Sequence, residues 1–174
     1  MADRRDRPSV PAPHAAAPGR AVDIADLAAL DALAIRLAAP ARTGDTFALS
    51  GELGAGKTAF ARAFIGALAK REGVPAPGDV PSPTFTLMQS YEIGALQLFH
   101  FDLYRLKSAE EALELGIEDA CAEGIALIEW PDRLGRYLPS DRIDVRLAVT
   151  GESSRRAEIA AHGRTRERYG EFAA

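Results

Sequence analysis

The chain of 174 residues, 47% apolar and 26% charged, has the length and composition of one globular domain, not of a multidomain, collagen-like or disordered protein. Its uncharged apolar stretches fall far short of the roughly 20 residues that span a bilayer, and its single cysteine, Cys121, cannot form an intramolecular disulfide, so we expect a cytoplasmic protein without a membrane segment. The net charge of −4 gives no overall basic surface for nucleic acid, so such a role would be local or carried by a partner.

Residues 1–20 are expected to form a disordered N-terminal arm. They hold four of the 11 prolines, mixed with alanine and arginine, and they show no periodic apolar face. The arginines of this arm are offset by Asp3 and Asp6, which does not favour a nucleic-acid-binding role. We place the folded domain at residues 21–162 and a C-terminal tail at residues 163–174.

The first predicted element is an amphipathic helix at Ile24–Ala38. Apolar residues recur there at mostly helical spacing, and Asp23 or Asp26 is available as the N-cap. Pro40 stops this helix. The next apolar run, Asp45–Ser50, predicts a short strand that enters a glycine-rich turn.

The remaining predicted elements alternate between helices and strands. They are a helix at Lys57–Arg71, strands at Phe85–Tyr91 and Leu96–Phe101, a helix from Ser108 through Leu115, an apolar run at Ile125–Glu129, and a hairpin of strands at Arg142–Val149 and Arg155–Ala161. Ser108 and Glu111 are interpreted as a capping box, with Gly116 closing that helix. Periodicity alone does not distinguish the run at 125–129 from a helix segment. The alternation predicts an α/β sheet with helices on both faces.

Residues Gly51–Thr58 (GELGAGKT) match the phosphate-binding motif G-x-x-x-x-G-K-[ST] without a gap. Its glycines permit backbone conformations that turn successive N–H groups inward around a phosphate, and the following helix adds its positive end. Lys57 would reach the β- and γ-phosphates, and the Thr58 hydroxyl is a hard ligand for Mg²⁺. Together with the flanking strand and helix, the motif predicts a three-layer P-loop NTPase-like sheet flanked by helices, with a C-terminal β-hairpin.

A P-loop requires an acid at the end of a neighbouring strand to hold or orient Mg²⁺. Two residues fit this requirement, because Asp102 follows the strand LQLFHF and Glu129 follows the run IALI. Their residue types and positions leave open which one contacts the metal directly. A simple strand-end carboxylate is the alternative for each of them.

The segment Ser82–Thr86 (SPTFT) lies between the P-loop helix and the acid-bearing strands. Its prolines restrict the backbone, and its hydroxyls can face a γ-phosphate or its metal, which is typical of a switch loop. Taken alone, the segment would also fit a plain proline turn before a strand. His100 is expected to be a strand residue with local hydrogen bonds, and a role beside the phosphate is the alternative.

Five motifs, taken together, resemble the TsaE family, also called YjeE. They are SGELGAGKTAF (Ser50–Phe60), SPTFTL (Ser82–Leu87), HFDLYRL (His100–Leu106), ELGIED (Glu114–Asp119) and LIEWP (Leu127–Pro131). The resemblance covers about residues 24 to 159. It implies a small bacterial ATPase that is required for N6-threonylcarbamoyladenosine (t6A) in tRNA.

The resemblance also implies ATP and Mg²⁺ as cofactors and a role for each matching residue. The nucleotide-binding residues would be Gly51, Glu52, Leu53, Gly54, Ala55, Gly56, Lys57, Thr58 and Ala59. Lys57 and Asp102 would act in catalysis, with Asp102 at the Walker B position, while Thr58 and Glu129 would carry the magnesium. The switch loop would comprise Ser82, Pro83, Thr84, Phe85 and Thr86, and Trp130 would lie beside the metal site.

The resemblance further implies slow ATP hydrolysis by the chain alone and two protein partners, TsaD and TsaB, through which tRNA would be met. Ten acidic residues against two basic ones between Glu92 and Asp132 agree with this, because such a surface repels a phosphate backbone. A small-molecule P-loop kinase would use the same lysine and acids, but it needs an acceptor pocket and an arginine-bearing lid. A nucleotide-dependent binding module without turnover is the third alternative.

Overall fold

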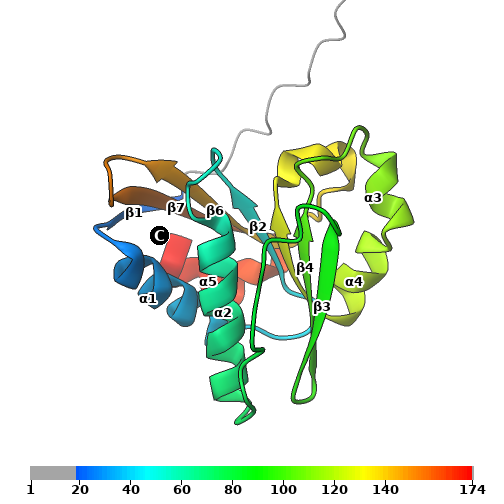
Figure 1. The fold of residues 1–174 in the computed structure, drawn as a ribbon, viewed down its shortest axis with the longest axis horizontal. Helices are drawn as coiled ribbons and strands as arrows, with labels where there is room; N and C mark the ends of the chain where they lie inside the picture. Colours follow the sequence, from blue (N-terminus) through cyan, green and yellow to red (C-terminus); the bar gives the residue numbers. More distant parts are fainter. Residues whose placement is uncertain (1–18, 174) are drawn as a thin grey trace, which may run out of the picture.

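The strand β5 (Ile125–Glu129) is buried along its whole length, as expected of an apolar run inside a parallel sheet. Ile125 and Leu127 contribute to one hydrophobic cluster, while Ala126 and Ile128 contribute to another. The computed structural model describes residues 19–173 and has helices on both sides of this sheet (Figure 1). The predicted three-layer α/β class is therefore confirmed, whereas residues 1–18 of the expected arm lie outside the described residues.

Seven strands form one mixed sheet in the order β1-β7-β6-β2-β5-β4-β3. The strands are β1 (Arg20–Ile24), β2 (Thr46–Ser50), β3 (Met88–Ile93), β4 (Leu96–Asp102), β5 (Ile125–Glu129), β6 (Arg142–Val149) and β7 (Arg155–His162). The helices are α1 (Leu27–Ala38), α2 (Lys57–Arg71), α3 (Glu110–Glu114), α4 (Ile117–Glu123), η1 (Pro131–Tyr137), η2 (Gly163–Thr165) and α5 (Arg166–Ala173). The central strands β6, β2, β5 and β4 are parallel, so their carboxyl ends meet at one edge of the sheet.

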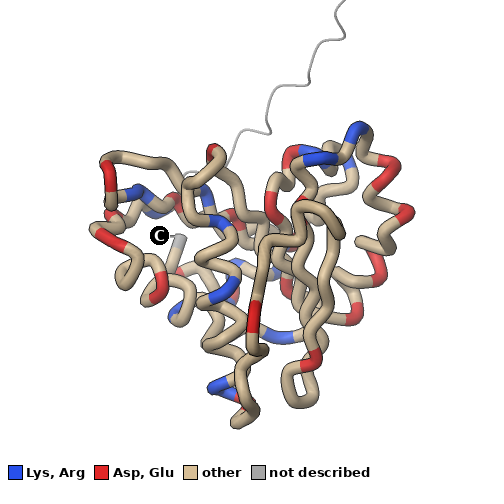
Figure 2. The backbone as a smooth tube through the Cα atoms, in the orientation of Figure 1, with Lys and Arg blue, Asp and Glu red and all other residues tan. Residues whose placement is uncertain are grey.

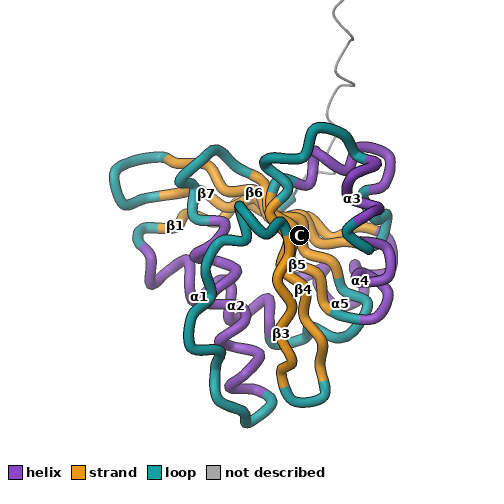
Figure 3. The backbone as a smooth tube through the Cα atoms, turned by 45° about the vertical axis from the view of Figure 1, so that its right-hand side comes forward, coloured by secondary structure: helices purple, strands orange, loops and turns teal. Residues whose placement is uncertain are grey.

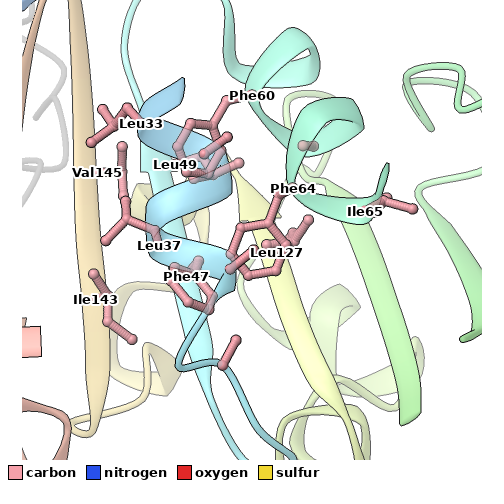
Figure 4. Close-up of a cluster of buried hydrophobic side chains, with 14 of the residues drawn as sticks. Leu33, Leu37, Phe47, Leu49, Phe60, Phe64, Ile65, Leu127, Ile143 and Val145 are labelled. Carbon is pink, nitrogen blue, oxygen red and sulfur yellow. The ribbon is translucent and has the colours of Figure 1, made fainter. Parts of the chain in front are cut away.

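Helices α1 and α2 cover one face of the central strands. Figure 4 shows Leu33 and Leu37 of α1, with Phe60 and Phe64 of α2, directed at the side chains of the sheet below them. The rings of Phe47 on β2 and Phe64 lie 4.6 Å apart in an edge-to-face arrangement. This packing fixes the N-terminus of α2 relative to the strand that precedes the glycine loop.

The other face of β4 and β5 is covered by α3, α4 and η1, so helices flank the sheet on two sides (Figure 3). Ile117 of α4 and Leu134 of η1 are buried in this second cluster. The outer surface of this layer is acidic, because residues 110–123 contain six Asp or Glu and no Lys or Arg (Figure 2). Among the described residues, no helix is long and apolar enough to cross a membrane.

The start of the first helix was predicted incorrectly. Ile24 belongs to strand β1 and pairs with Arg155, and the helix begins at Leu27. Asp26 is the N-cap, since its side chain accepts a hydrogen bond of 2.9 Å from the backbone N–H of Ala29. The apolar spacing continued through Ile24 because the same residue faces the core from a strand.

The capping box at Ser108 and Glu111 is also wrong. Ala109 is the N-cap of α3, and Glu111 accepts from the backbone N–H of Lys107 at 3.1 Å. Gly116 ends α3 as expected, but with a φ of 72° it also starts α4, a helix that the sequence pattern did not reveal. The predicted strand Phe85–Tyr91 begins only at Met88, because a turn occupies the residues before it.

The residues expected to form a C-terminal tail fold against the domain instead. Tyr169 of α5 is fully buried, and its hydroxyl donates to Asp45 Oδ2 at 3.2 Å. Arg168 pairs with both carboxylate oxygens of Asp45, which is itself 2% exposed. The helix escaped prediction because only two large apolar residues, Tyr169 and Phe172, connect it to the core.

Replacing Tyr169 with alanine is expected to lower the free energy of unfolding by about 3–5 kcal/mol, the usual cost of removing a buried aromatic side chain. Phe85→Ala is the matched control, since Phe85 is 82% exposed, and it should cost less than about 1 kcal/mol. Urea titrations of both variants measure the difference. Equal losses would show that α5 does not belong to the cooperative core.

The buried Tyr169 phenol should also make stability fall at alkaline pH. Burial, followed by the Asp45 carboxylate, raises the phenol's pKa above its ordinary value, and Arg168 opposes this shift. Because the folded-state pKa is the higher one, this contribution is complete below about pH 10 and is lost above it. Between about pH 10 and 12, the wild type should lose up to ~1.4 kcal/mol per pH unit more than Tyr169→Phe in urea titrations. Parallel pH profiles would contradict the assignment.

Candidate functional site

The loop between β2 and α2 takes a backbone path that requires glycine. Gly51, Gly54 and Gly56 have φ values of 141°, 81° and 108°, in the region that L side chains rarely adopt. A Cβ atom on Gly51 would lie 2.3 Å from the carbonyl oxygen of Leu147 on β6, so the loop also passes too close to that strand for any side chain. Gly56 is the N-cap of α2, so the N–H groups of the first turn that follow it have no partner within the helix.

Lys57, the first residue of α2, is folded back onto this loop. Its ammonium donates to the carbonyl oxygens of Gly51 and Glu52, both at 2.8 Å, and lies 4.2 Å from the centre of the Trp130 ring. The side chain is almost completely buried, and burial lowers the pKa of the lysine. The carboxylates of Glu129 and then Asp102 oppose that shift, so the lysine lies within the field of both acids.

The acid at the end of β5 receives two hydrogen bonds on one oxygen. Thr58 Oγ1 donates to Glu129 Oε1 at 2.9 Å, and His100 Nε2 lies 2.9 Å from the same atom. Glu129 is 3% exposed, so these contacts are made away from water. They join the P-loop helix, β5 and β4 at a single carboxylate.

Asp102 lies beside Glu129, because the register of β4 and β5 pairs these two residues. Ser82 Oγ and Thr84 Oγ1 donate to Asp102 Oδ2 at 2.9 and 2.7 Å. The backbone N–H of Tyr104 donates to the other oxygen at 3.1 Å. Two of the three hydroxyls that were expected to face a phosphate or metal, those of Ser82 and Thr84, therefore hold the segment 82–86 against Asp102.

Trp130 continues the site beyond Glu129. Its backbone is left-handed, with a φ of 60°, and its backbone N–H donates to the carbonyl oxygen of Leu49 at 3.2 Å. Its ring contacts Lys57 and also Tyr104, whose ring centre lies 4.9 Å from that of Trp130. The residue expected next to the metal site thus contacts the P-loop lysine.

The structure does not bring every expected side chain into this cluster. Glu52 and Leu53 are exposed, and Leu53 reaches 79% exposure, while Ala59 packs against the hydrophobic core. Any phosphate contact at these three positions would be made by the backbone. In the segment 82–86, Pro83 is buried, Thr86 is exposed, and Phe85 points outward with the Arg105 guanidinium 4.4 Å from its ring centre.

His100 contacts Glu129 of the site, although the sequence favoured a strand residue with local hydrogen bonds over a role beside the phosphate. It precedes Asp102 by two positions on β4, so strand alternation places both residues on one face. The register then brings that face next to Glu129. The spacing His-x-Asp was the available signal, but it identifies a contact only once the neighbouring strand is known.

The donor set fits Mg²⁺ better than a metal that prefers nitrogen or sulfur. A hydroxyl and two carboxylates are hard oxygen ligands, and Mg²⁺ usually keeps several waters in addition to one or two carboxylates. Among residues 19–173, no group of three or more His, Cys, Asp or Glu could hold a metal ion by itself. The glycine loop fits a phosphate group at the N-terminus of α2, and the Leu147 carbonyl leaves no room for a side chain at Gly51.

A glycine loop between a parallel strand and a helix, with acids at the carboxyl ends of adjacent strands, defines the P-loop class of α/β folds. Residues 24–157 match the family model described as "Threonylcarbamoyl adenosine biosynthesis protein TsaE". The chain belongs to the TsaE family.

Relatives and a solved structure support this membership. Two proteins named tRNA threonylcarbamoyladenosine biosynthesis protein TsaE, from Rickettsia felis and Bacillus subtilis, are 39% and 35% identical to the chain over 73% and 76% of its length, covering 71% and 79% of their own. The crystal structure of Bacillus subtilis YdiB is similar with a TM-score of 0.70 and 28% identity, covering 91% of this chain and 95% of that one.

Removing the two hydroxyls that reach Asp102 is expected to loosen residues 81–87. In a Ser82→Ala/Thr84→Val double variant, backbone amides of this segment should exchange with deuterium about tenfold faster, because hydrogen bonds to a carboxylate are lost. Hydrogen-exchange mass spectrometry measures the effect. Thr86→Val, in the same loop but exposed, should leave exchange unchanged, and equal rates in all proteins would contradict the role of these contacts.

Proposed function

We propose that the chain binds ATP with Mg²⁺, hydrolyses it, and thereby serves t6A biosynthesis on tRNA together with the partner subunits TsaD and TsaB. The observation that carries the proposal is the meeting of Lys57, Thr58, Asp102 and Glu129 beside the glycine loop, at one edge of the sheet. Family membership supports the pathway, and this geometry supports the chemistry.

The chain's own residues would bind the nucleotide as follows. Backbone N–H groups of residues 51–59 surround the phosphates, at the positive end of α2. Lys57 exchanges the neutral carbonyl oxygens of Gly51 and Glu52 for charged phosphate oxygens, which form stronger hydrogen bonds with an ammonium group. Its buried position favours this exchange, because a cation away from water gains more from anionic phosphate oxygens than from neutral carbonyl oxygens.

Thr58, Glu129 and Asp102 would hold the metal, directly or through water. Bound Mg²⁺ would neutralise charge that develops on the phosphates. We assign Asp102 to orienting an attacking water, since it already accepts hydrogen bonds from the hydroxyls of Ser82 and Thr84. Glu129 accepts a hydrogen bond from Thr58, which supports a role for this acid on the metal side of the site.

Segment 82–86 would couple the state of the nucleotide to the surface. Its hydroxyls bond to Asp102 on the inner side, while Phe85 is exposed on the outer side. A change in the ligands of Asp102 would therefore alter the presentation of Phe85 to a protein partner. Such a partner would be TsaD or TsaB, and hydrolysis would reset the transferase complex between rounds of modification.

The charge distribution supports contact with tRNA through the partners. The α3–α4 layer is acidic along residues 110–123 (Figure 2). An acidic surface repels the phosphate backbone and provides no release of condensed cations on binding. The substrate of this chain itself would be ATP.

Replacing Lys57 with alanine is expected to reduce ATP hydrolysis about 100-fold, the usual cost of removing one donor to a developing charge. Lys70→Ala is the matched control, because Lys70 lies exposed on the same helix. Phosphate release is measured for each protein alone and with TsaD, TsaB and tRNA, with and without EDTA. Partners should stimulate the wild type and Lys70→Ala, and EDTA should stop both reactions.

The same assay separates the alternatives. Transfer of phosphate to a metabolite without stimulation by the partners would contradict the proposal and favour a kinase. Nucleotide binding with no turnover under any condition would indicate a binding module.

A further inference from the structure

His100 has an environment that a simple core residue would not need. Its ring is completely buried on β4, and Nε2 contacts Glu129 Oε1 at 2.9 Å. Its other nitrogen, Nδ1, is buried without a hydrogen-bond partner among the described residues. An apolar side chain would fill the same space without leaving a buried polar atom unsatisfied, so packing alone does not account for histidine here.

The contact with Glu129 has a definite direction. A carboxylate oxygen only accepts hydrogen bonds, so we place the hydrogen on Nε2, which donates to Oε1. The same oxygen accepts from Thr58 Oγ1, whereas Oε2 accepts no hydrogen bond within residues 19–173. Two donors from different elements, α2 and β4, therefore fix one oxygen and leave the other available.

We infer that His100 is a positioning residue that orients Glu129 toward the Mg²⁺ that accompanies the nucleotide. The inference rests on the proposed function, because it takes Glu129 as a metal-side acid. His100 itself is not a ligand: its Nε2 is occupied by Glu129, and an imidazole is a poor partner for Mg²⁺. Its effect passes through the hydrogen bond to the carboxylate, as contacts behind a metal ligand commonly do.

Thr58 cannot provide this orientation alone. Its hydroxyl is expected to take part in metal binding, so its geometry changes with the state of the site. His100 comes from β4, whose backbone is bonded in register to β5, and its ring is fixed by complete burial. It is therefore the contact that keeps Glu129 in place both before and after the metal arrives.

Two amide substitutions test which nitrogen matters. The amide nitrogen of glutamine reaches the position of Nε2, whereas that of asparagine reaches only the position of Nδ1. We expect His100→Gln to keep the donor to Glu129, and His100→Asn and His100→Phe to lose it. Calorimetric titration with ADP, in Mg²⁺ and in EDTA, gives the factor by which Mg²⁺ strengthens ADP binding. That factor should fall about 10–100-fold in the Asn and Phe variants and stay near the wild-type value in Gln.

The control is a second histidine that contacts a carboxylate elsewhere. His162 on β7 has its Nε2 2.8 Å from Asp144 Oδ2, outside the cluster around Glu129. His162→Asn should leave the Mg²⁺ factor unchanged. In a Glu129→Gln background, His100→Asn should add no further loss, because the acid through which His100 acts is already removed.

The outcomes separate this inference from the function on which it rests. Absence of ADP binding, or of any strengthening by Mg²⁺, in the wild type would contradict the proposed function itself. If Mg²⁺ strengthens ADP binding in the wild type, and does so by the same factor in His100→Gln and His100→Asn, only the positioning role would be overturned. Should His100→Phe fail to fold, the comparison of the two amide variants, with their folding checked by circular dichroism, still decides between the results.

Discussion

A buried carboxylate needs hydrogen-bond donors, and much of the site follows from this need at Glu129. The strand β5 is buried from Ile125 onward, so the acid at its end is also removed from water. Burying a charge without compensation is costly, and the surrounding elements supply the compensation. Thr58 comes from the P-loop helix and His100 from the adjacent strand, while the Lys57 cation lies within the field of the same acid. The P-loop helix and the strands β4 and β5 thus meet at the Glu129 carboxylate.

The same reasoning applies to Lys57, the cation opposite these acids. Two carbonyl oxygens and the face of Trp130 satisfy its ammonium in a site where water is largely excluded. Desolvation disfavours the charged form, and the two strand-end acids favour it. Anionic phosphate oxygens would stabilise the charged form of Lys57 further. The lysine would therefore leave its neutral carbonyl acceptors for a bound nucleotide.

The sequence was sufficient where local chemistry decides the structure. The glycines of the P-loop and the helix from Lys57 each carry their own signal, and the alternation of predicted strands and helices indicated the α/β class. The apolar run at 125–129 fitted a buried strand, but periodicity alone did not exclude a helix segment. It was insufficient where a residue acquires its role from a neighbouring strand. Ile24 has an apolar side chain that suits either a helix or a strand, and only pairing with β7 decides between them. The contact of His100 with Glu129 depends on the register between β4 and β5. The hydroxyls of Ser82 and Thr84 reach Asp102 because of a turn, and a turn has no apolar periodicity from which it could be predicted.

The C-terminal helix α5, which the sequence did not predict, is linked to the site through strand β2. Asp45 lies just before β2 and is held by Arg168 and Tyr169 of α5. At the other end of β2, Gly51 passes close against the Leu147 carbonyl of β6, which leaves no room for a side chain. The strand that delivers the P-loop is therefore fixed at its start by α5 and at its end by the hairpin strand. Since interiors are close-packed and transmit displacement, loss of the anchor at Asp45 would reach the loop through five residues of a buried strand. A segment that looks like a tail in the sequence thus contributes to the position of the phosphate-binding loop.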